Sequence, residues 1–245
     1  MAAVTKIDAG LTASGSNQKK QAPELGAVMH EHVYNRLRDA LITGRLTPGR
    51  ALSVRGIAAE FDVSAMPARE AIRQLAAVGA LEFTDTRRVS IAKMTAEKLE
   101  EIKTARLLLE PILAERSLIS VAGKQREKRR LLRSLEKHDA ALDAAIRRGD
   151  VSQYTQYNSA FHFELYRASG SAVLIDLVES LWLRFGPFMR VVIGRLGTSC
   201  LIDDRHKDIM EAIEAEDAKA LKKAVRDDLL HGMNNIDVAE IEADT

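Results

Sequence analysis

Cysteine is almost absent from this chain of 245 residues, which contains only Cys200. One cysteine cannot build an intramolecular disulfide framework or a zinc site with several cysteine ligands, and it fits the reducing cytosol. Aromatic residues are also scarce, at 4%, yet the hydrophobic fraction of 46% is ample for real cores. Ala, Leu, Arg and Glu recur throughout, and this composition favours helix.

Long apolar runs are missing as well. No run approaches the ~20 residues that a membrane-spanning helix needs, so we expect no membrane contact. The N-terminal stretch MAAVTKIDAGLTASGSNQKKQAP has no apolar segment of the kind found in signal peptides. We therefore expect a cytoplasmic protein whose residues 1–25 form a disordered or loosely tethered arm.

Charge is nearly balanced overall, with a formal net charge of +1, but it is unevenly distributed. Residues 26–93 contain ten Lys/Arg and seven Asp/Glu, whereas residues 94–245 contain twenty-three and twenty-six. A mildly basic N-terminal part therefore precedes a mildly acidic C-terminal part. A difference of this size also fits ordinary scatter, so it matters only in combination with motifs.

Residues 26–93 have the order of elements found in a winged helix-turn-helix. VMHEHVYNRLRDALITG carries an apolar stripe at helical spacing. A short helix follows Ser53 and a longer one follows Ser64, and serine is a favourable residue just before a helix. The runs LEFT (81–84) and VSIA (89–92) then predict a β-hairpin joined by the turn DTRR. This order predicts a winged DNA-binding domain.

Residues 94–245 are predicted to be helical almost throughout. Short polar or glycine-containing breaks separate six candidate helices, and short connections favour antiparallel neighbours. We therefore predict a mainly α protein, in which an all-α antiparallel six-helix bundle follows the winged domain. The expected helices cover approximately residues 95–121, 126–148, 151–168, 172–194, 203–215 and 217–235.

Several of these stretches resemble one known family. ITGRLTPGRALS and VSAMPAREAIRQL, with the hairpin after them, resemble the winged-helix domain of GntR-type transcription regulators. The helical remainder resembles the FadR-type C-terminal (FCD) ligand-binding domain of that family, and the resemblance covers residues 28–235. It implies a transcription regulator, most often a repressor, that binds operator DNA as a homodimer. The helical part would then bind a small-molecule effector and form the dimer.

The helix after Ser64 is the one that we expect to read DNA. If its N-terminal turn enters the major groove, side chains there reach base edges or phosphates, and Arg69 can bind guanine through two hydrogen bonds. The resemblance implies DNA contacts for Arg55, Ser64 and Arg69. A plain helix cap at Ser64 and an internal ion pair of Arg69 are the alternatives. The predicted DNA-binding residues are Arg55, Ser64, Ala65, Met66, Arg69, Arg87 and Arg88.

Two features depart from the family pattern. Most members have an arginine and then a threonine after VS, whereas this chain has Ala65 and Met66, and its wing has no glycine at the tip. An arginine donor for the groove is therefore missing at position 65. We expect an atypical operator preference, in which apolar contacts to thymine methyl groups replace that donor.

Four polar residues of the helical part have the spacing of a ligand set. Asn158 and His162 are four residues apart, so one helix face carries both. His206 precedes the turn at Asp217 by eleven residues and Asp228 follows it by eleven, so an antiparallel hairpin places both side chains at the same height. Bundles build metal sites from such positions. Two imidazoles, a carboxylate and an amide suit a divalent ion, Zn²⁺ first, with Ni²⁺ or Mn²⁺ as alternatives.

The resemblance implies the same four positions. Many FCD domains hold a metal through an aspartate four residues before a histidine and through two further histidines 22 residues apart. The matching residues here are Asn158, His162, His206 and Asp228, so a carboxylate is lost at 158 and gained at 228. His231, one turn after Asp228, is a weaker candidate for the last ligand. Anion binding without a metal, and ordinary structural roles for these residues, are the alternatives.

Arg106 lies four residues before a glutamate in ARLLLEP, which allows an ion pair within one helix. The resemblance implies instead that Arg106 faces a pocket and binds an effector carboxylate together with His162 and His206. The planar guanidinium fork suits that task. Arg184 and Arg190, beside an aromatic cluster, are weaker candidates for the same pocket.

Two other classes of function compete with an effector-responsive regulator. A metal-dependent enzyme could use the His/Asp cluster to activate water or oxygen. No general base is recognisable beside the cluster, however, and the DNA-binding part would then have no role. An architectural DNA-binding protein without an effector is the third possibility. We therefore expect a regulator and no enzyme.

Overall fold

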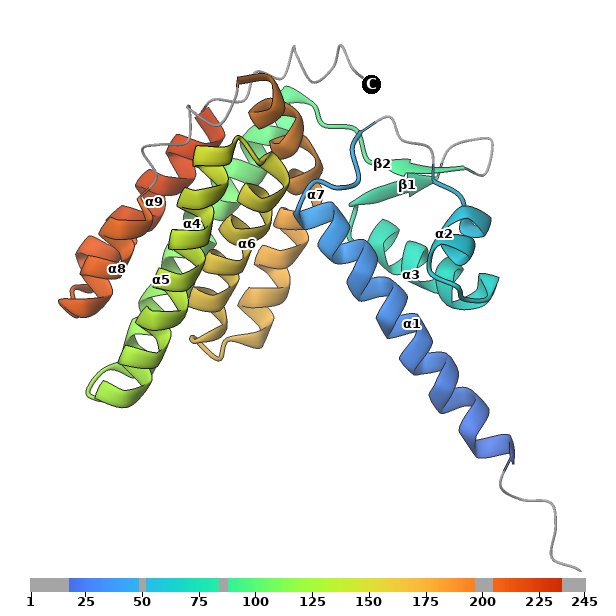
Figure 1. The fold of residues 1–245 in the computed structure, drawn as a ribbon, viewed down its shortest axis with the longest axis horizontal. Helices are drawn as coiled ribbons and strands as arrows, with labels where there is room; N and C mark the ends of the chain where they lie inside the picture. The colour runs from blue at the N-terminus through green and yellow to red at the C-terminus, as the bar shows by residue number, and fades with distance from the viewer. Residues whose placement is uncertain (1–17, 49–51, 84–87, 197–204, 235–245) are drawn as a thin grey trace, which may run out of the picture.

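The structure, a computed structural model, describes residues 18–48, 52–83, 88–196 and 205–234. Two parts lie side by side in Figure 1: a small N-terminal part with a two-stranded hairpin, and a larger bundle of helices. The first helix runs between them, and its C-terminal end touches the bundle.

The small part has the predicted order of elements. Its helices are α1 Gln18–Ile42, α2 Val54–Glu60 and α3 Ala65–Ala77, and its strands are β1 Leu81–Phe83 and β2 Val89–Ile91. Helix α1 begins earlier than expected, inside the predicted 1–25 arm, because residues 18–22 are glutamine, lysine and alanine, which favour helix. Residues 1–17 lie outside the described part of the chain.

The core of the small part forms between α1 and α3. Val33, Leu37 and Leu41 of α1 are buried, as are Ile72 and Leu75 on the facing side of α3. These positions repeat every three to four residues, which is the spacing of one helix face. Burying this face of α3 leaves its opposite face at the surface.

The hairpin extends this small part beyond α3. Strands β1 and β2 pair antiparallel, with Leu81 opposite Ile91. Gly79 provides the turn from α3 into β1 because its φ of +74° lies in the left-handed region that favours glycine. The predicted wing is therefore present, and the residues at its tip, 84–87, lie outside the described part.

The six predicted helices of the bundle are present, with ends within three residues of those expected. Helices α5 and α6, α6 and α7, and α8 and α9 pack as antiparallel neighbours, and α9 also packs along α4. Among the described residues, no helix combines the length and apolarity needed to cross a membrane. The helices are α4 Ala96–Val121, α5 Gln125–Arg148, α6 Val151–Arg167, α7 Ala172–Leu196, α8 His206–Glu214 and α9 Ala218–Asn234.

A proline within α4 determines one contact between α4 and α9. Pro111 has no backbone N–H, so the carbonyl of Leu107, four residues earlier, lacks its usual helical donor. The side chain of Arg226 on α9 donates to that carbonyl from Nη1 at 3.1 Å. The bond stabilises the packing of α9 on α4 beside the centre of the bundle.

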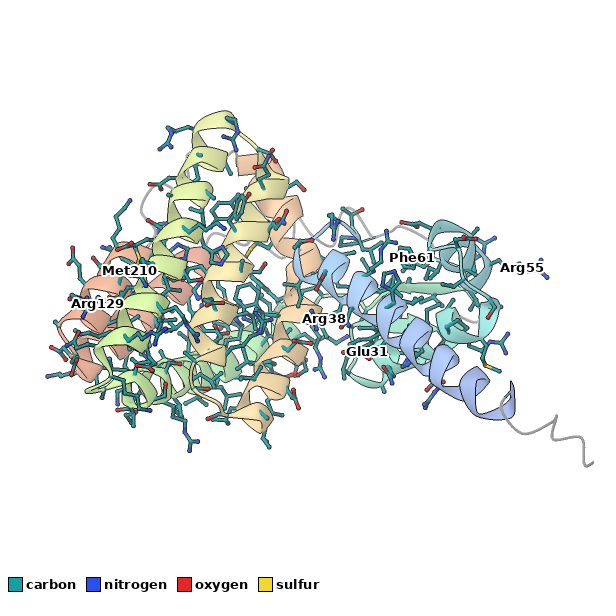
Figure 2. The ribbon with its side chains drawn as sticks, turned by 60° about the horizontal axis from the view of Figure 1, so that its bottom comes forward. Glu31, Arg38, Arg55, Phe61, Arg129 and Met210 are labelled. Carbon is teal, nitrogen blue, oxygen red and sulfur yellow. The ribbon has the colours of Figure 1, made fainter. Side chains whose placement is uncertain are left out.

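The two parts meet where the end of α1 packs on α6 and α7. Thr155 of α6 donates from Oγ1 to the carbonyl of Thr43, just after α1, at 2.8 Å. Arg184 of α7 donates from Nε to the carbonyl of Val78, just after α3, at 2.7 Å. Figure 2 shows Arg38 at this boundary. Two helices of the bundle, α6 and α7, therefore contact the small part directly.

Gly186 of α7 lies where α7 approaches α1 most closely. A Cβ atom at this position would lie 2.5 Å from the carbonyl oxygens of Leu41 and Ile42. Backbone atoms cannot rotate away as a flexible side chain can. The present spacing of the two helices therefore requires glycine at position 186.

Candidate functional site

The N-terminal turn of α3 presents exposed side chains, as expected for a helix that reads DNA. Ala65, Met66 and Arg69 are exposed, and Met66 has 74% of its surface accessible. An apolar side chain this exposed, beside an arginine, suits contact with a base edge. Within the described residues, Arg69 has no ion pair or hydrogen bond, so the alternative of an internal partner is not observed.

Ser64 precedes α3 with extended backbone angles, which is the N-cap position, but its side chain makes no capping hydrogen bond. Ser64 therefore occupies the expected N-cap position, but the alternative of a plain capping role is not observed. Ser53, by contrast, caps α2 by accepting from the amide of Gly56 at 3.0 Å. The Ser64 hydroxyl is exposed and can reach a phosphate instead.

The other predicted DNA contacts lie around this helix. Figure 2 shows Arg55, at the start of α2, at the edge of the small part farthest from the bundle. Arg88 precedes β2 and is exposed. Arg87 lies outside the described residues. Arg55 therefore lies on the side of the small part that faces away from the bundle.

In the bundle, three of the four predicted ligands come together. His162, His206 and Asp228 each offer one ligand atom, and these atoms lie within 4.8 Å of one another. His162 Nε2 lies 3.1 Å from Asp228 Oδ2. Both histidines are fully buried and Asp228 is almost so. Three helices, α6, α8 and α9, contribute one residue each.

The remaining predicted ligand, Asn158, is buried one turn before His162. It lines a cavity of about 30 Å³ together with His162, Asp228 and Arg106. His231 also lines this cavity, but it does not belong to the cluster of three described ligand atoms. The geometry therefore favours Asp228 over His231.

Hydrogen bonds hold the carboxylate of Asp228 in its ionised form. Burial is the largest single influence and would raise the pKa of Asp228. The hydrogen bond with His162, the charges of both histidines and the hydrogen bond from the Arg205 amide together outweigh burial, so the pKa lies well below its usual value. The amide of Arg205 donates to Oδ1 at 3.3 Å. The cluster therefore contains a carboxylate rather than a carboxylic acid.

Arg106 forms the expected ion pair within α4 and also lines the cavity. Its Nε lies 2.5 Å from Glu110 Oε1, so the ion pair within α4 is present. The pair is buried, with 2% and 0% of the two side chains exposed, and Arg106 also lines the cavity. Its guanidinium packs over the rings of Trp182 and Phe185. A buried pair differs from the weak surface pair that the sequence suggested, since loss of either partner would leave an unpaired charge.

Glu110 accepts further hydrogen bonds that sequence reasoning missed. Tyr166 of α6 donates its hydroxyl to Oε2 at 2.6 Å, and Trp182 of α7 donates from Nε1 to Oε1 at 3.2 Å. The same hydroxyl lies 3.2 Å from His162 Nδ1. Burial, and then the charge of Glu110, raise the pKa of Tyr166 well above its usual value, so the phenol keeps its proton. These contacts connect α4 with the ligand cluster.

Asp139 is a second residue that the sequence did not reveal. This buried residue of α5 places Oδ1 3.4 Å from His206 Nδ1. The ring of His206 also stacks on Phe161, with centroids 3.9 Å apart. Each of the two histidines therefore has an acidic group behind it: His206 directly, and His162 through Tyr166.

Arg184 is not a residue of the cavity, although the sequence placed it among the weaker candidates. It is exposed and binds the Val78 carbonyl at the junction with the small part. Its position on the outer side of α7, two residues after Trp182, accounts for the difference. The side chain of Arg190 lies outside the described part of the structure.

Comparison with known proteins identifies both parts of the chain. Residues 29–91 match "Bacterial regulatory proteins, gntR family", and residues 101–231 match the FCD domain. The HTH-type transcriptional regulator McbR of Escherichia coli (strain K12) is 26% identical over 193 residues, which are 78% of this chain and 84% of that protein. The gluconate operon transcriptional repressor of Bacillus subtilis (strain 168) is 27% identical over 178 residues, 73% and 68% of the two chains.

Solved structures have the same fold. The structure of E. coli McbR/YncC matches with a TM-score of 0.75 at 24% identity, covering 82% of this chain and 93% of that one. A GntR-type regulator from Rhodococcus sp. RHA1 matches with a TM-score of 0.66 at 23% identity, covering 87% and 97%. The named relatives are transcription regulators, not enzymes. The exposed reading helix, the hairpin after it and the two family matches therefore agree: the chain belongs to the GntR family of bacterial transcription regulators and carries an FCD domain.

Proposed function

We propose that this regulator is a homodimeric, ligand-responsive repressor whose helical domain binds a divalent metal ion and a small organic acid. The observation that carries the proposal is the buried cluster of His162, His206 and Asp228, which shares a cavity with Arg106. The metal is Zn²⁺ in the first instance, with Ni²⁺ or Mn²⁺ as alternatives.

The residues of the cluster fit such an ion. Two imidazoles and an ionised carboxylate are ligands that zinc prefers, and the Asn158 amide is near enough in the chain to be the fourth. Ligand atoms about 2.0–2.2 Å from a tetrahedral ion lie about 3.3–3.6 Å apart. The three ligand atoms lie within 4.8 Å of one another, so the side chains would have to draw together around an ion.

Charge favours an organic acid as the effector. The charges of Arg106 and Glu110 cancel each other. The cavity therefore carries the negative charge of Asp228 when both imidazoles are neutral. A bound divalent ion would reverse the sign of this charge and offer an open position to a carboxylate. Arg106 lines the same cavity and can donate to the second oxygen or to another carboxylate of the ligand.

The size of the cavity supports a response to ligand. About 30 Å³ holds little more than two water molecules, since one needs roughly 10–15 Å³. An acid of several carbon atoms would therefore displace lining side chains such as Met189 of α7 and Met233 of α9. Ligand binding is then coupled to the position of α7.

Two of the helices that line the cavity, α6 and α7, also contact the DNA-binding part. Asn158 is three residues after Thr155, which binds the Thr43 carbonyl. Trp182 is four residues before Gly186, which lies against the end of α1. A shift of α6 or α7 would therefore move the small part. A ligand would change the affinity for DNA to the extent that it binds one position of the small part relative to the bundle more tightly than another.

Exposed apolar side chains support the homodimer. Arg116 of α4 donates to Ser171, next to α7, so these two helices lie side by side. Large apolar residues at helical spacing remain exposed on both helices, and such patches mark protein–protein contacts. These residues are Leu108, Ile112 and Ile119 on α4 and Val173 and Leu177 on α7.

DNA binding in the presence of ligand tests this function. A duplex that the protein itself selects from a random pool serves as operator, and fluorescence anisotropy measures its affinity with Zn²⁺ and acetate, malate, citrate or gluconate. We expect at least one acid to weaken binding by about 5- to 150-fold. His162→Ala should abolish this response, and His138→Ala, on α5 outside the cavity lining, should retain it. An equal response of His162→Ala and the unchanged protein would refute the proposed site.

A further inference from the structure

The hydroxyl of Tyr166 lies between a carboxylate and an imidazole. It is 2.6 Å from Glu110 Oε2 and 3.2 Å from His162 Nδ1. A phenol has one proton to donate, and an ionised carboxylate can only accept. Since Glu110 is paired with Arg106, the proton of Tyr166 goes to Glu110. The Tyr166 oxygen therefore faces the imidazole as an acceptor.

Each ring nitrogen of His162 faces an acceptor. The contact with Tyr166 is a hydrogen bond only if Nδ1 bears a proton. The other ring nitrogen, Nε2, lies 3.1 Å from Asp228 Oδ2, and the ionised carboxylate accepts a hydrogen bond there when no metal is bound. A metal ion bound between His162 and Asp228 would displace the hydrogen on Nε2 and leave the one on Nδ1.

We propose that Tyr166 and Glu110 are positioning residues that hold the hydrogen of His162 on Nδ1 and so keep Nε2 available as a metal ligand. This inference rests on the metal site proposed above, and it concerns residues to which no role has been assigned. Histidines that bind metals commonly donate their second N–H to a supporting group, which fixes the ring and its tautomer. Here the support is a phenol backed by a buried carboxylate.

The same carboxylate fixes the orientation of Arg106. Glu110 receives Nε and Nη2 of the guanidinium, at 2.5 and 3.4 Å. Nη1 remains on the other side, 3.8 Å from the sulfur of Met233, a residue of the cavity lining. A ligand carboxylate therefore meets the Nη1 side of Arg106. Glu110 sets the positions of both the metal ligand and the anion-binding arginine.

The test compares two phenylalanine substitutions on α6 in the full-length protein. Tyr166→Phe removes the hydroxyl, whereas Tyr157→Phe makes the same change at a residue outside the cavity lining. The first measurement is Co²⁺ affinity, by competition with a chromophoric chelator. We expect Tyr166→Phe to bind Co²⁺ about 10- to 100-fold more weakly, and Tyr157→Phe to equal the unchanged protein.

The second measurement separates positioning from a purely structural role. Proton NMR of the His162 ring in the Zn²⁺-loaded protein reports whether the hydrogen on Nδ1 is hydrogen-bonded. We expect a downfield, hydrogen-bonded Nδ1 proton in the unchanged protein and in Tyr157→Phe, and an upfield shift of this proton in Tyr166→Phe. An unchanged proton shift, or an unchanged Co²⁺ affinity, in Tyr166→Phe overturns this inference alone. If the unchanged protein binds no Co²⁺, the metal site is refuted and this inference with it.

Discussion

Asn158 and Asp228 differ in what each can give to a cation. The amide of Asn158 is neutral, whereas Asp228 is an ionised carboxylate 3.1 Å from His162. A carboxylate contributes charge as well as a lone pair, so most of the affinity for a divalent ion should depend on Asp228. The loss of a carboxylate at 158 relative to the family pattern makes this dependence stronger.

We therefore predict that Asp228→Ala loses more metal than Asn158→Ala. Zn²⁺ affinity, measured by calorimetry, should fall by at least about 100-fold in the first variant and by about tenfold or less in the second. Asp227→Ala is the matched control, since Asp227 pairs with Lys223 on the outer side of α9. Equal losses at 158 and 228 would mean that the ligand set is wrong.

The buried pair of Arg106 and Glu110 makes a prediction about stability. Glu110→Gln leaves a buried arginine without its counter-charge, which costs about 3–5 kcal/mol of the free energy of unfolding. Replacing both residues together, Arg106→Met with Glu110→Leu, removes both charges and should cost less than the single change. Urea unfolding of the three proteins measures the difference. A double variant less stable than Glu110→Gln would show that the pair itself is strongly stabilising.

Sequence patterns predicted contacts within one helix or one hairpin, and missed those that depend on packing between distant helices. The four-residue spacings of Asn158–His162 and Arg106–Glu110, and the equal distances of His206 and Asp228 from Asp217, were sufficient to bring those pairs together. The hydrogen bonds of Glu110 to Tyr166 and Trp182, and the approach of Asp139 to His206, join residues 56 to 72 positions apart in the chain. No local spacing encodes such contacts.

At the scale of elements, α7 connects the cavity beside the His/Asp cluster with the DNA-binding part. Trp182 lines the cavity and donates to Glu110, and Gly186 lies against the end of α1 one turn later. The sequence predicted the extent of α7 but not this contact, because a glycine within a helix gives no sign of which backbone approaches it.

Two glycines within helices should respond oppositely to alanine. Alanine normally stabilises the interior of a helix by up to about 1 kcal/mol relative to glycine, and Gly232 of α9 has open space for a Cβ. Gly186→Ala should instead destabilise the protein, because its Cβ would lie 2.5 Å from two carbonyl oxygens of α1. Thermal unfolding measures both changes. Stabilisation by Gly186→Ala would show that α7 is free to move away from α1.

At the scale of the whole molecule, the proposed homodimer would present two winged parts together to an operator. The exposed apolar residues of α4 and α7 are available for this purpose, since they lie on the bundle rather than on the reading helix. Dimer formation through them would set the distance between two reading helices and hence between two half-sites.

A charge placed in this surface should separate the subunits. Leu108→Glu is predicted to halve the mass measured by light scattering and to weaken binding to a palindromic duplex, because a buried unpaired carboxylate opposes association. Phe83→Glu changes an equally exposed apolar residue in the wing and should leave the mass unchanged. A Leu108→Glu protein with the mass of the unchanged protein would place the dimer contact elsewhere.

The central claim is that the buried His/Asp cluster is a metal site, and Zn²⁺ titration calorimetry tests it most directly. The full-length protein, stripped of metal, should bind one Zn²⁺ per chain, His138→Ala should do the same, and His162→Ala should lose this binding. Absence of Zn²⁺ binding by the unchanged protein, or equal binding by His162→Ala, would contradict the account.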